Sequence, residues 1–354
     1  NCTGLIDIHP DNSNSGDLSI VGYSFSNNQL FIDTKYYDYV RRTDRSYSDH
    51  LIKLLGIQPR QPDVPLELGQ KNFQDYADIA CSAQKILEDL LFLIFEHAYK
   101  ITNETKFLFS GGVAMNSAAV SKTPKLKFIK ELNIPPSPGD SGSAIGAAYY
   151  GFIQKNKENL KNNFPKKNII NCLFPGVSKS NEDFFELVFN KIADEKSSIE
   201  KVSELLASNE IIATCFGNIE TGPRALGHRS LICNAHNSEL IKKLSTEIKK
   251  RNLFRPTAPV ILKENAEKYF YLNETLMSCY FHMASIATPK KDISNDIKGV
   301  IHADNSSRIQ ICQEDQLLGK ILFKLKKYNI YLIANTSFNI SSDPMVYDKE
   351  DAFL

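Results

Sequence analysis

The chain has 354 residues and a formal net charge of +1, so bulk electrostatics give it no preference for nucleic acid or for an anionic membrane surface. Its length allows two domains, each with its own core. No apolar run approaches the ~18 residues of a membrane span, and seven cysteines without a Cys-x-x-Cys pair argue against a disulfide framework or a zinc knuckle. We therefore expect a cytoplasmic protein that binds neither nucleic acid nor membrane.

The first hundred residues predict a hairpin followed by helices. Apolar residues alternate with polar ones over residues 18–33, which is typical of a β-hairpin. Residues 47–55 predict a short amphipathic helix. Residues 75–99 carry apolar side chains at the spacing of one helix face, which predicts a long helix. No residue in this part has an evident chemical role.

A glycine-rich stretch, residues 109–116, follows an apolar run at 107–109 that predicts a buried strand. Gly111 and Gly112 would let the backbone turn sharply and present N–H groups to an anion. Asn116 would stand at the entrance of the next helix. This stretch therefore predicts a nucleotide or phosphate site.

A second glycine-rich stretch lies roughly 28 residues further on, at residues 138–148. Here Asp140 precedes a small-residue helix over residues 143–149, where it could cap the helix or hold a metal. The Lys- and Asn-rich run at residues 155–167 follows, and we interpret it as the boundary between two domains.

The second half places basic and amide side chains at loop-like positions. A strand over residues 210–216 runs into a loop with two arginines and a histidine, and a helix beginning near residue 238 ends in a basic run. Residues 302–311 read as a strand-like segment, and a buried strand over 330–334 leads into an amide-rich loop. The candidate ligand-binding residues are Arg224, His228, Lys249, Arg255, Arg308, Asn335 and Ser337.

A single arginine is more often a surface or structural ion pair than a ligand contact. Several basic loops in one half of a nearly neutral chain shift that balance toward a small polyanionic ligand, held by bidentate guanidinium contacts. We expect these cations to converge on one pocket.

The chain resembles the NodU/CmcH family of O-carbamoyltransferases in six ordered motifs. They are Gly-Gly-Val-Ala-Met-Asn at 111–116, Gly-Asp-Ser-Gly-Ser-Ala-Ile-Gly-Ala-Ala at 139–148, Gly-Pro-Arg-Ala-Leu-Gly-His-Arg-Ser at 222–230, Arg-Asn-Leu-Phe-Arg-Pro-Thr-Ala-Pro at 251–259, His-Ala-Asp-Asn-Ser-Ser-Arg-Ile-Gln at 302–310 and Asn-Thr-Ser-Phe-Asn at 335–339.

The resemblance implies an α/β protein of two parts. Residues 1–163 would be the carboxy-terminal portion of an actin-like ATPase domain similar to the tRNA threonylcarbamoyl transferase. Residues 171–354 would be a YrdC-like open twisted α/β domain. In such an enzyme the YrdC-like part makes carbamoyl-adenylate from carbamoyl phosphate and ATP, and the actin-like part passes the carbamoyl group to a hydroxyl of a small-molecule metabolite, as in natural product biosynthesis.

The resemblance also implies roles for the candidate residues. Arg224, Lys249, Arg255 and Arg308 would be catalytic cations, and His228, Asn335 and Ser337 would help them bind carbamoyl phosphate or the adenylate. Gly111, Gly112 and Asn116 would bind the nucleotide. Asp140 would hold a divalent metal of the Fe²⁺ or Mg²⁺ class. A His-x-x-x-His pair that completes the family's metal site has no counterpart in this sequence.

Two interpretations remain open from the residues alone. The first is an ATP-dependent O-carbamoyltransferase with carbamoyl phosphate, ATP and a hydroxylated acceptor as its partners. The second is a nucleotide-binding module, or half of a split enzyme, without transfer activity alone. A homodimer or a complementing amino-terminal chain fits either interpretation.

Overall fold

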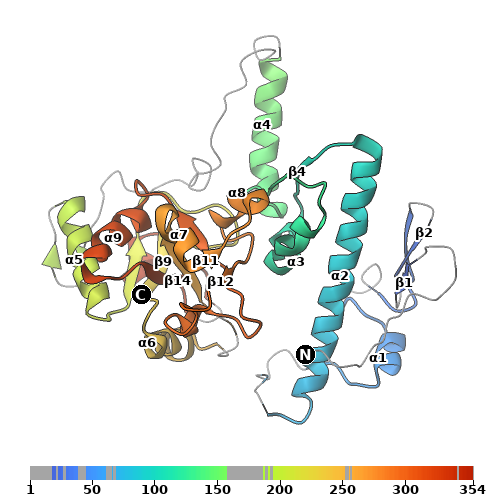
Figure 1. Ribbon diagram of the computed structural model, residues 1–354, viewed down its shortest axis with the longest axis horizontal. Helices are drawn as coiled ribbons and strands as arrows, with labels where there is room; N and C mark the ends of the chain where they lie inside the picture. Colours follow the sequence, from blue (N-terminus) through green and yellow to red (C-terminus); the bar gives the residue numbers. More distant parts are fainter. Residues whose placement is uncertain are drawn as a thin grey trace. The chain divides into compact units, whose positions relative to one another are not determined.

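The computed structural model describes residues 18–20, 23–26, 29–38, 45–60, 66, 69–157, 186–187, 190–191, 194–251, 255, 257–340 and 343–353. The chain divides into two compact units, residues 1–103 and 104–354 (Figure 1). The predicted domains, 1–163 and 171–354, stay a prediction, and most of the predicted linker lies outside the described residues.

The first unit contains a small sheet and two helices. Strands β1 (Leu18–Ile20), β2 (Tyr23–Ser26) and β3 (Gln29–Ile32) pair antiparallel in that order, which confirms the predicted hairpin and adds one strand to it. Helix α1 (Asp49–Leu55) begins at a serine side chain that accepts a backbone N–H. Helix α2 (Phe73–Thr102) is the predicted long helix, extended at both ends.

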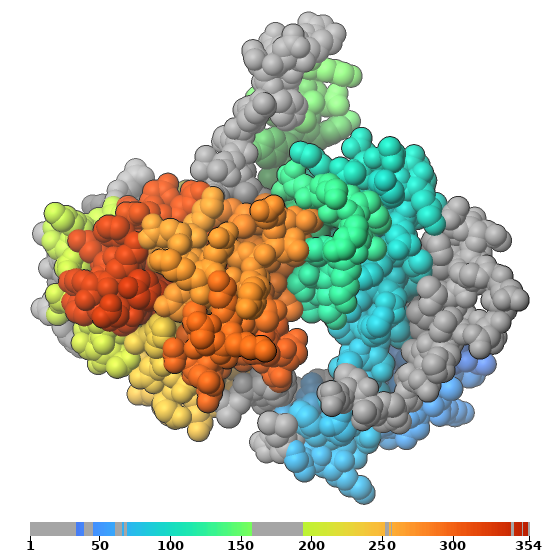
Figure 2. Space-filling model, viewed as in Figure 1, coloured from blue at the N-terminus to red at the C-terminus, as the bar shows by residue number. Residues whose placement is uncertain are grey.

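The second unit begins with a pair of parallel strands, β4 (Lys106–Leu108) and β5 (Glu131–Asn133). Between them lie η1 (Gly112–Met115), α3 (Ser117–Lys122) and η2 (Thr123–Lys125), and after them η3 (Asp140–Gly142) and α4 (Ser143–Lys155). Strand β5 packs against η6 (Glu274–Leu276) and α8 (Met277–Tyr280). In Figure 2 the green and orange surfaces of these two segments adjoin.

The rest of the second unit is built on a five-stranded sheet of order β13-β10-β14-β9-β8. Its strands are β8 (Ile212–Cys215), β9 (Arg229–Asn234), β10 (Ala258–Leu262), β13 (Gln310–Cys312) and β14 (Leu332–Ser337). Strands β10 and β13 run parallel, and the other neighbouring pairs run antiparallel. The predicted α/β class is confirmed.

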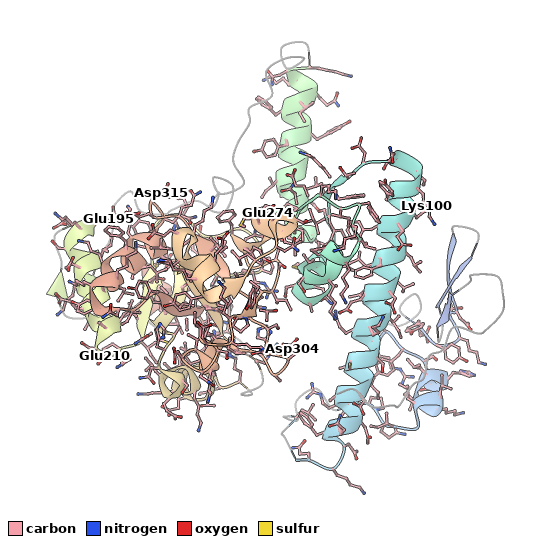
Figure 3. The ribbon with its side chains drawn as sticks, viewed as in Figure 1. Lys100, Glu195, Glu210, Glu274, Asp304 and Asp315 are labelled. Atoms are coloured by element: carbon pink, nitrogen blue, oxygen red, sulfur yellow. The ribbon has the colours of Figure 1, made fainter. Side chains whose placement is uncertain are left out.

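Helices α5 (Glu195–Ala207) and α9 (Leu317–Leu325) pack together and cover apolar residues of this sheet (Figure 1). Buried leucines and isoleucines recur along α9 at the spacing of one helix face, and burying each contributes roughly 1.5–3 kcal/mol. Lys320 of α9 forms a partly exposed ion pair of 2.5 Å with Glu195 of α5, and Figure 3 labels Glu195. The core therefore lies between this helix pair and the sheet.

The remaining elements are short and connect the strands. They are β6 (Glu186–Leu187), β7 (Asn190–Lys191), α6 (Ser238–Lys243), the π-helical turn η5 (Leu244–Ile248), α7 (Lys263–Tyr269), β11 (Phe270–Tyr271), β12 (Thr288–Pro289), η7 (Lys298–Val300), η8 (Lys326–Tyr328) and α10 (Lys349–Phe353). Among the described residues, no helix combines the length and apolar character needed to cross a bilayer.

Among the described residues, four cysteines follow the sequence prediction and one does not. Cys215, Cys233, Cys279 and Cys312 are free thiols. Burial raises the pKa of the Cys233 and Cys279 thiols to about 12, so both are protonated and unreactive at neutral pH. Cys81 is disulfide-bonded.

Candidate functional site

The loop between β8 and β9 brings the Gly-Pro-Arg motif against two other parts of the second unit. Gly222 has φ +90°, and a Cβ there would lie 2.0 Å from the carbonyl oxygen of Pro136. Gly227 has φ +120°, and its Cβ would lie 2.5 Å from Leu318 Cγ. Both positions therefore require glycine, for the left-handed backbone and for the close approach.

The carbonyl groups of this loop are held by two buried amides. Asn335 donates through Nδ2 to Ala225 O and to Gln310 Oε1, both at 2.9 Å, and Gln310 Nε2 donates to Leu226 O at 3.0 Å. Asn335 is 2 % exposed. Its predicted contact with a carbamoyl group stays a prediction, and in this structure its amide braces the loop that carries Arg224.

Three guanidinium groups gather beside that loop, those of Arg224, Arg251 and Arg308. The pKa of Arg308 falls to about 10, first because the side chain is buried and then because of the charges of Arg224 and Arg251. Burial lowers the pKa of the other two as well. In the described part of the chain no carboxylate pairs with any of them.

The hydrogen bonds of this cation cluster (Arg224, Arg251 and Arg308) leave much of its donor capacity unused. Arg224 Nη2 donates to Met115 O at 3.4 Å, and Arg251 Nη2 donates to Thr257 Oγ1 at 3.1 Å. The Nε atoms of Arg251 and Arg308 are buried and find no partner within the described residues. Neighbouring like charges with free donors, and with no carboxylate partner among the described residues, suit an anion with several oxygens.

Arg251 is the residue that reasoning from the sequence missed. Its signal was present, because it stands two positions after Lys249 in the basic run that ends the helix. The helix does not end as a regular α-helix. The π-helical turn η5 precedes Lys249, whose N–H donates to Leu244 O at 2.9 Å, and Arg251 N donates to Ser245 O at 3.1 Å. The backbone N–H groups of Lys249 and Arg251 are thus both bonded to this turn.

Lys249 is buried and hydrogen-bonded to the amide-rich segment. Its Nζ lies 2.9 Å from Ser337 O, 3.2 Å from Ser337 Oγ, 2.7 Å from Asn339 O and 2.5 Å from Asn339 Oδ1. Burial, followed by the charge of Arg251, lowers the pKa of this ammonium to about 8. Lys249 and Ser337 are thus brought together as expected, but with the ammonium engaged by protein oxygens.

Arg255 is exposed, and its charge contributes to lowering the pKa of Arg251. Arg251 is therefore close enough to interact electrostatically with both Arg255 and Lys249. The catalytic roles of Arg255 and Lys249 stay predictions.

Two expectations about secondary structure here are wrong. Residues 302–308 form a turn, closed by the 2.7 Å hydrogen bond from His302 N to Ser306 O, and not a continuous strand. Ser307 makes only an isolated antiparallel bridge to Ala287, and the strand itself is β13. Asn335 and Ser337 do not follow a strand but lie within β14, paired with β9.

The 302–308 turn positions a histidine near the cluster. Ser306 Oγ lies 2.9 Å from His302 Nδ1 and 2.6 Å from Asp304 Oδ1. Burial lowers the pKa of His302, the Asp304 carboxylate opposes that shift, and the charge of Arg308 adds to it. The imidazole is therefore neutral at pH 7.

His228, the other histidine of the predicted site, contacts the loop that contains it. Its Nδ1 lies 2.6 Å from Asn218 O, and because a carbonyl only accepts, Nδ1 carries the proton. Its ring meets Phe216 edge to face at 5.2 Å. Burial lowers its pKa. A role for His228 in adenylate binding stays a prediction.

The two glycine-rich turns lie side by side. Gly111 N donates to Pro138 O at 2.7 Å, so this N–H is already used within the protein. Asn116 caps α3, because its Oδ1 accepts from Ala119 N at 3.0 Å, which confirms its place at a helix entrance. The contact between Arg224 and Met115 joins these turns to the cation cluster.

Asp140 is exposed, and no group of three or more histidine, cysteine, aspartate or glutamate side chains in the described part of the chain could hold a metal ion. One carboxylate does not make a divalent site, which takes several oxygen or nitrogen ligands. The described residues do not fit the expected metal.

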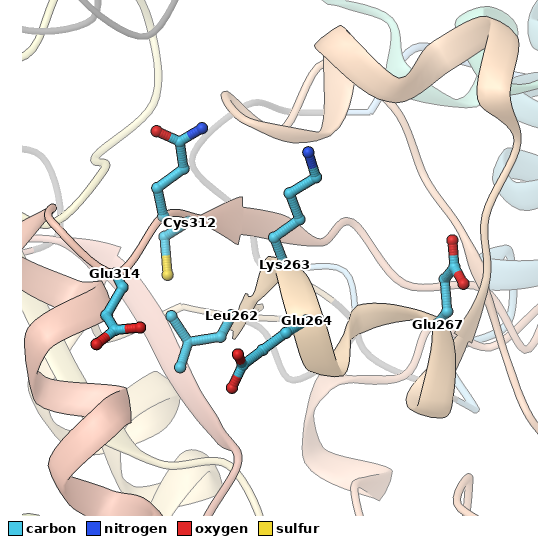
Figure 4. Close-up of a pocket in the computed structure, with 7 residues that line it drawn as sticks. Leu262, Lys263, Glu264, Glu267, Cys312 and Glu314 are labelled. Carbon is cyan, nitrogen blue, oxygen red and sulfur yellow. The ribbon is translucent and has the colours of Figure 1, made fainter.

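A separate pocket of about 470 Å³ lies at the start of α7 (Figure 4). It is lined by Leu262, Lys263, Glu264, Glu267, Cys312, Gln313 and Glu314. It shares no residue with the cation cluster, and its three carboxylates disfavour a phosphate-containing ligand. We therefore place the anion site at the cluster and not in this pocket.

An α/β fold whose partly buried guanidinium groups have no carboxylate partner among the described residues suits the binding of phosphate-like anions. Family models name the class more closely: the model described as carbamoyltransferase N-terminus matches residues 53–149, and the one described as carbamoyltransferase C-terminus matches residues 203–354. The chain belongs to the carbamoyltransferase family, a family of enzymes.

Relatives of known sequence agree with this assignment. Nodulation protein NolO of Bradyrhizobium diazoefficiens is 26% identical over 308 residues, which cover 84% of this chain and 54% of that protein. Nodulation protein NolNO of Sinorhizobium fredii is 26% identical over 308 residues, covering 84% of this chain and 43% of that protein. The chain thus spans about half the length of these relatives.

Solved structures give weaker likenesses. HypF of T. kodakarensis is 20% identical with a TM-score of 0.35, covering 48% of this chain and 20% of that one. Sua5 of P. abyssi in complex with L-threonine is 15% identical with a TM-score of 0.32, covering 44% of this chain and 42% of that one. Scores of this size do not carry a fold assignment.

Proposed function

We propose that this chain takes part in ATP-dependent O-carbamoyl transfer from carbamoyl phosphate to a hydroxyl group of a small-molecule metabolite. The observation that carries the proposal is the cation cluster of Arg224, Arg251 and Arg308 in a member of the carbamoyltransferase family. Such a cluster matches the charge of carbamoyl phosphate and of the ATP phosphates. The finer domain assignments, actin-like for 1–163 and YrdC-like for 171–354, belong to the same proposal.

The chemistry we propose has three steps. Water cleaves carbamoyl phosphate to carbamate and phosphate. A carbamate oxygen then attacks the α-phosphorus of ATP, which forms carbamoyl-adenylate and releases pyrophosphate. Finally the acceptor hydroxyl attacks the carbamoyl carbon, its proton passes to a base, and AMP leaves.

The residues supply electrostatic stabilisation in the second step. Negative charge builds on the leaving pyrophosphate, and guanidinium donors fixed in a partly buried site stabilise it more strongly than water would. The pKa of Arg308 is lowered the most of the three, to about 10. A bound anion would therefore stabilise the charged form of Arg308 the most. The nucleotide would extend toward Gly111, Gly112 and Asn116, which the Arg224 contact joins to the cluster.

The alternative, a nucleotide-binding module or half of a split enzyme, makes a different prediction for one experiment. The full chain is incubated with carbamoyl phosphate, ATP and labelled pyrophosphate, with and without a polyhydroxylated acceptor. Exchange of label into ATP that requires carbamoyl phosphate supports adenylate formation. Exchange without carbamoylated product supports the half-enzyme alternative, and absence of exchange refutes the proposal.

A further inference from the structure

The loop that carries Arg224 is closed by one buried carboxylate. Glu220 is 6 % exposed. Its Oε1 accepts the backbone N–H groups of Leu226 at 2.9 Å, His228 at 2.8 Å and Arg229 at 3.0 Å. Its Oε2 is buried and has no hydrogen-bond partner among the described residues. Burying a carboxylate costs free energy unless hydrogen bonds replace its hydration. The three backbone N–H groups supply these hydrogen bonds to Glu220.

The neighbouring cation does not pair with Glu220. The Arg229 guanidinium donates instead to backbone carbonyls, at 2.9 Å to Tyr347, 2.8 Å to Phe216 and 3.3 Å to Gly217. In the described part of the chain no salt bridge involves Glu220. Among the described residues, Glu220 therefore accepts hydrogen bonds from the backbone of the loop and from no side chain.

The geometry closes the loop into a ring. We call the part of the loop that leaves β8 its outgoing limb and the part that leads into β9 its returning limb. Glu220 lies on the outgoing limb, and the N–H groups that it accepts lie on the returning limb. The excursion between the limbs, residues 221–225, holds Arg224. On its other side the carbonyls of Ala225 and Leu226 are bound by Asn335 and Gln310. The polar backbone groups at the base of the excursion are thus fixed from both sides.

We infer that Glu220 is a positioning residue, which fixes Arg224 within the cation cluster by binding the returning limb of its loop. The inference rests on the proposed function, because the cluster is the site of that function. It assigns Glu220 no contact with substrate. A displacement of about 1 Å in a positioned group can cost on the order of 100-fold in rate, so a small movement of the loop would be measurable.

The test is a double-mutant cycle on the full chain. Glu220→Gln keeps the side chain's size and removes its charge, which weakens all three N–H contacts. Arg224→Ala removes the group that Glu220 is inferred to position. Exposed Glu210, labelled in Figure 3, provides the matched control Glu210→Gln. Two quantities are measured: kcat/KM for carbamoyl phosphate in pyrophosphate exchange, and the Kd of pyrophosphate by calorimetry.

We expect Glu220→Gln to lower kcat/KM and weaken pyrophosphate binding by roughly 100-fold. The double variant is then no worse than Arg224→Ala, because both changes remove the same contact. Glu220→Asp, which keeps the charge, recovers part of the loss, and Glu210→Gln behaves as wild type. Multiplicative losses in the double variant overturn the inference, since Glu220 would then act independently of Arg224.

The outcomes separate this inference from the proposed function. If the wild-type chain shows no exchange, the proposed function fails, and the pyrophosphate Kd values still decide the role of Glu220. If the Gln and Asp variants are both unfolded by circular dichroism, Glu220 is a folding residue and the inference is overturned. Wild-type affinity for pyrophosphate in folded Glu220→Gln overturns it as well.

Discussion

Replacing Arg308 by methionine should make the protein more stable and less able to bind anions. Methionine keeps the apolar stem and removes the charge. The pKa of Arg308 falls from 12.5 to about 10 in the folded chain, which corresponds to about 3 kcal/mol that the fold spends on keeping this guanidinium charged. At pH 7 the group is charged in both the folded and the unfolded state, so the whole penalty is present there.

Solvent screening and relaxation reduce that figure, so we expect a gain of about 1–3 kcal/mol in the free energy of unfolding for Arg308→Met. Urea unfolding followed by circular dichroism, in a buffer free of phosphate and pyrophosphate, measures it. Lys201→Met, which removes an exposed cation from α5, is the control and should change stability by less than about 0.5 kcal/mol.

The functional effect should have the opposite sign. Arg308→Ala should lose about 2–4 kcal/mol of transition-state stabilisation in pyrophosphate exchange, and Arg308→Lys should recover only part of it, because a point charge does not replace a planar fork. A fall in stability of more than 1 kcal/mol for anion-free Arg308→Met would show that the guanidinium has a favourable partner. Unchanged exchange in Arg308→Ala would remove it from the site.

Three further results are expected from the same structure. Lys249→Met should cost about 1–3 kcal/mol in urea unfolding, because the buried oxygens around Ser337 lose their donor; a neutral result would mean that water replaces the ammonium. Gly222→Ala should make the loop sensitive to limited proteolysis, because the new Cβ meets Pro136 O; a resistant loop would contradict this packing. Burial lowers the pKa of His282 to about 4. As the pH falls from 7 to 5, His282 therefore binds a proton in the unfolded state but not in the folded state. The free energy of unfolding should drop by about 2 kcal/mol for this reason. His282→Gln should remove this part of the pH dependence.

The sequence predicted elements well where a local signal sets them. The helical spacing over 75–99 and the turn residues of the hairpin depend only on near neighbours, and both elements formed. Asn116 was placed correctly for the same reason, since a helix cap is a local hydrogen bond.

Predictions from the sequence failed where contacts between residues distant in the chain set the local structure. Asn335 looked like a loop residue after a strand, but its strand continues because β9 supplies partners for its backbone. The turn at 302–308 was read as a strand because apolar residues follow it, and the 302 N to 306 O bond that bends it has no signature in apolar spacing. Arg251 was overlooked since a basic run at a helix end is usually solvated, and only the fold brings Arg224 and Arg308 to it.

The π-helical turn at Leu244–Ile248 has a consequence for how this segment can change. Successive residues of a regular α-helix are rotated by about 100° around its axis. A π turn holds one residue more than an α turn, so a single deletion inside these five residues would restore ordinary winding and leave Lys249 and Arg251 on nearly the same side of the helix. A deletion in the regular turns of α6 would instead swing both cations to another side, so this segment should tolerate the loss of a residue within the π turn better than just before it.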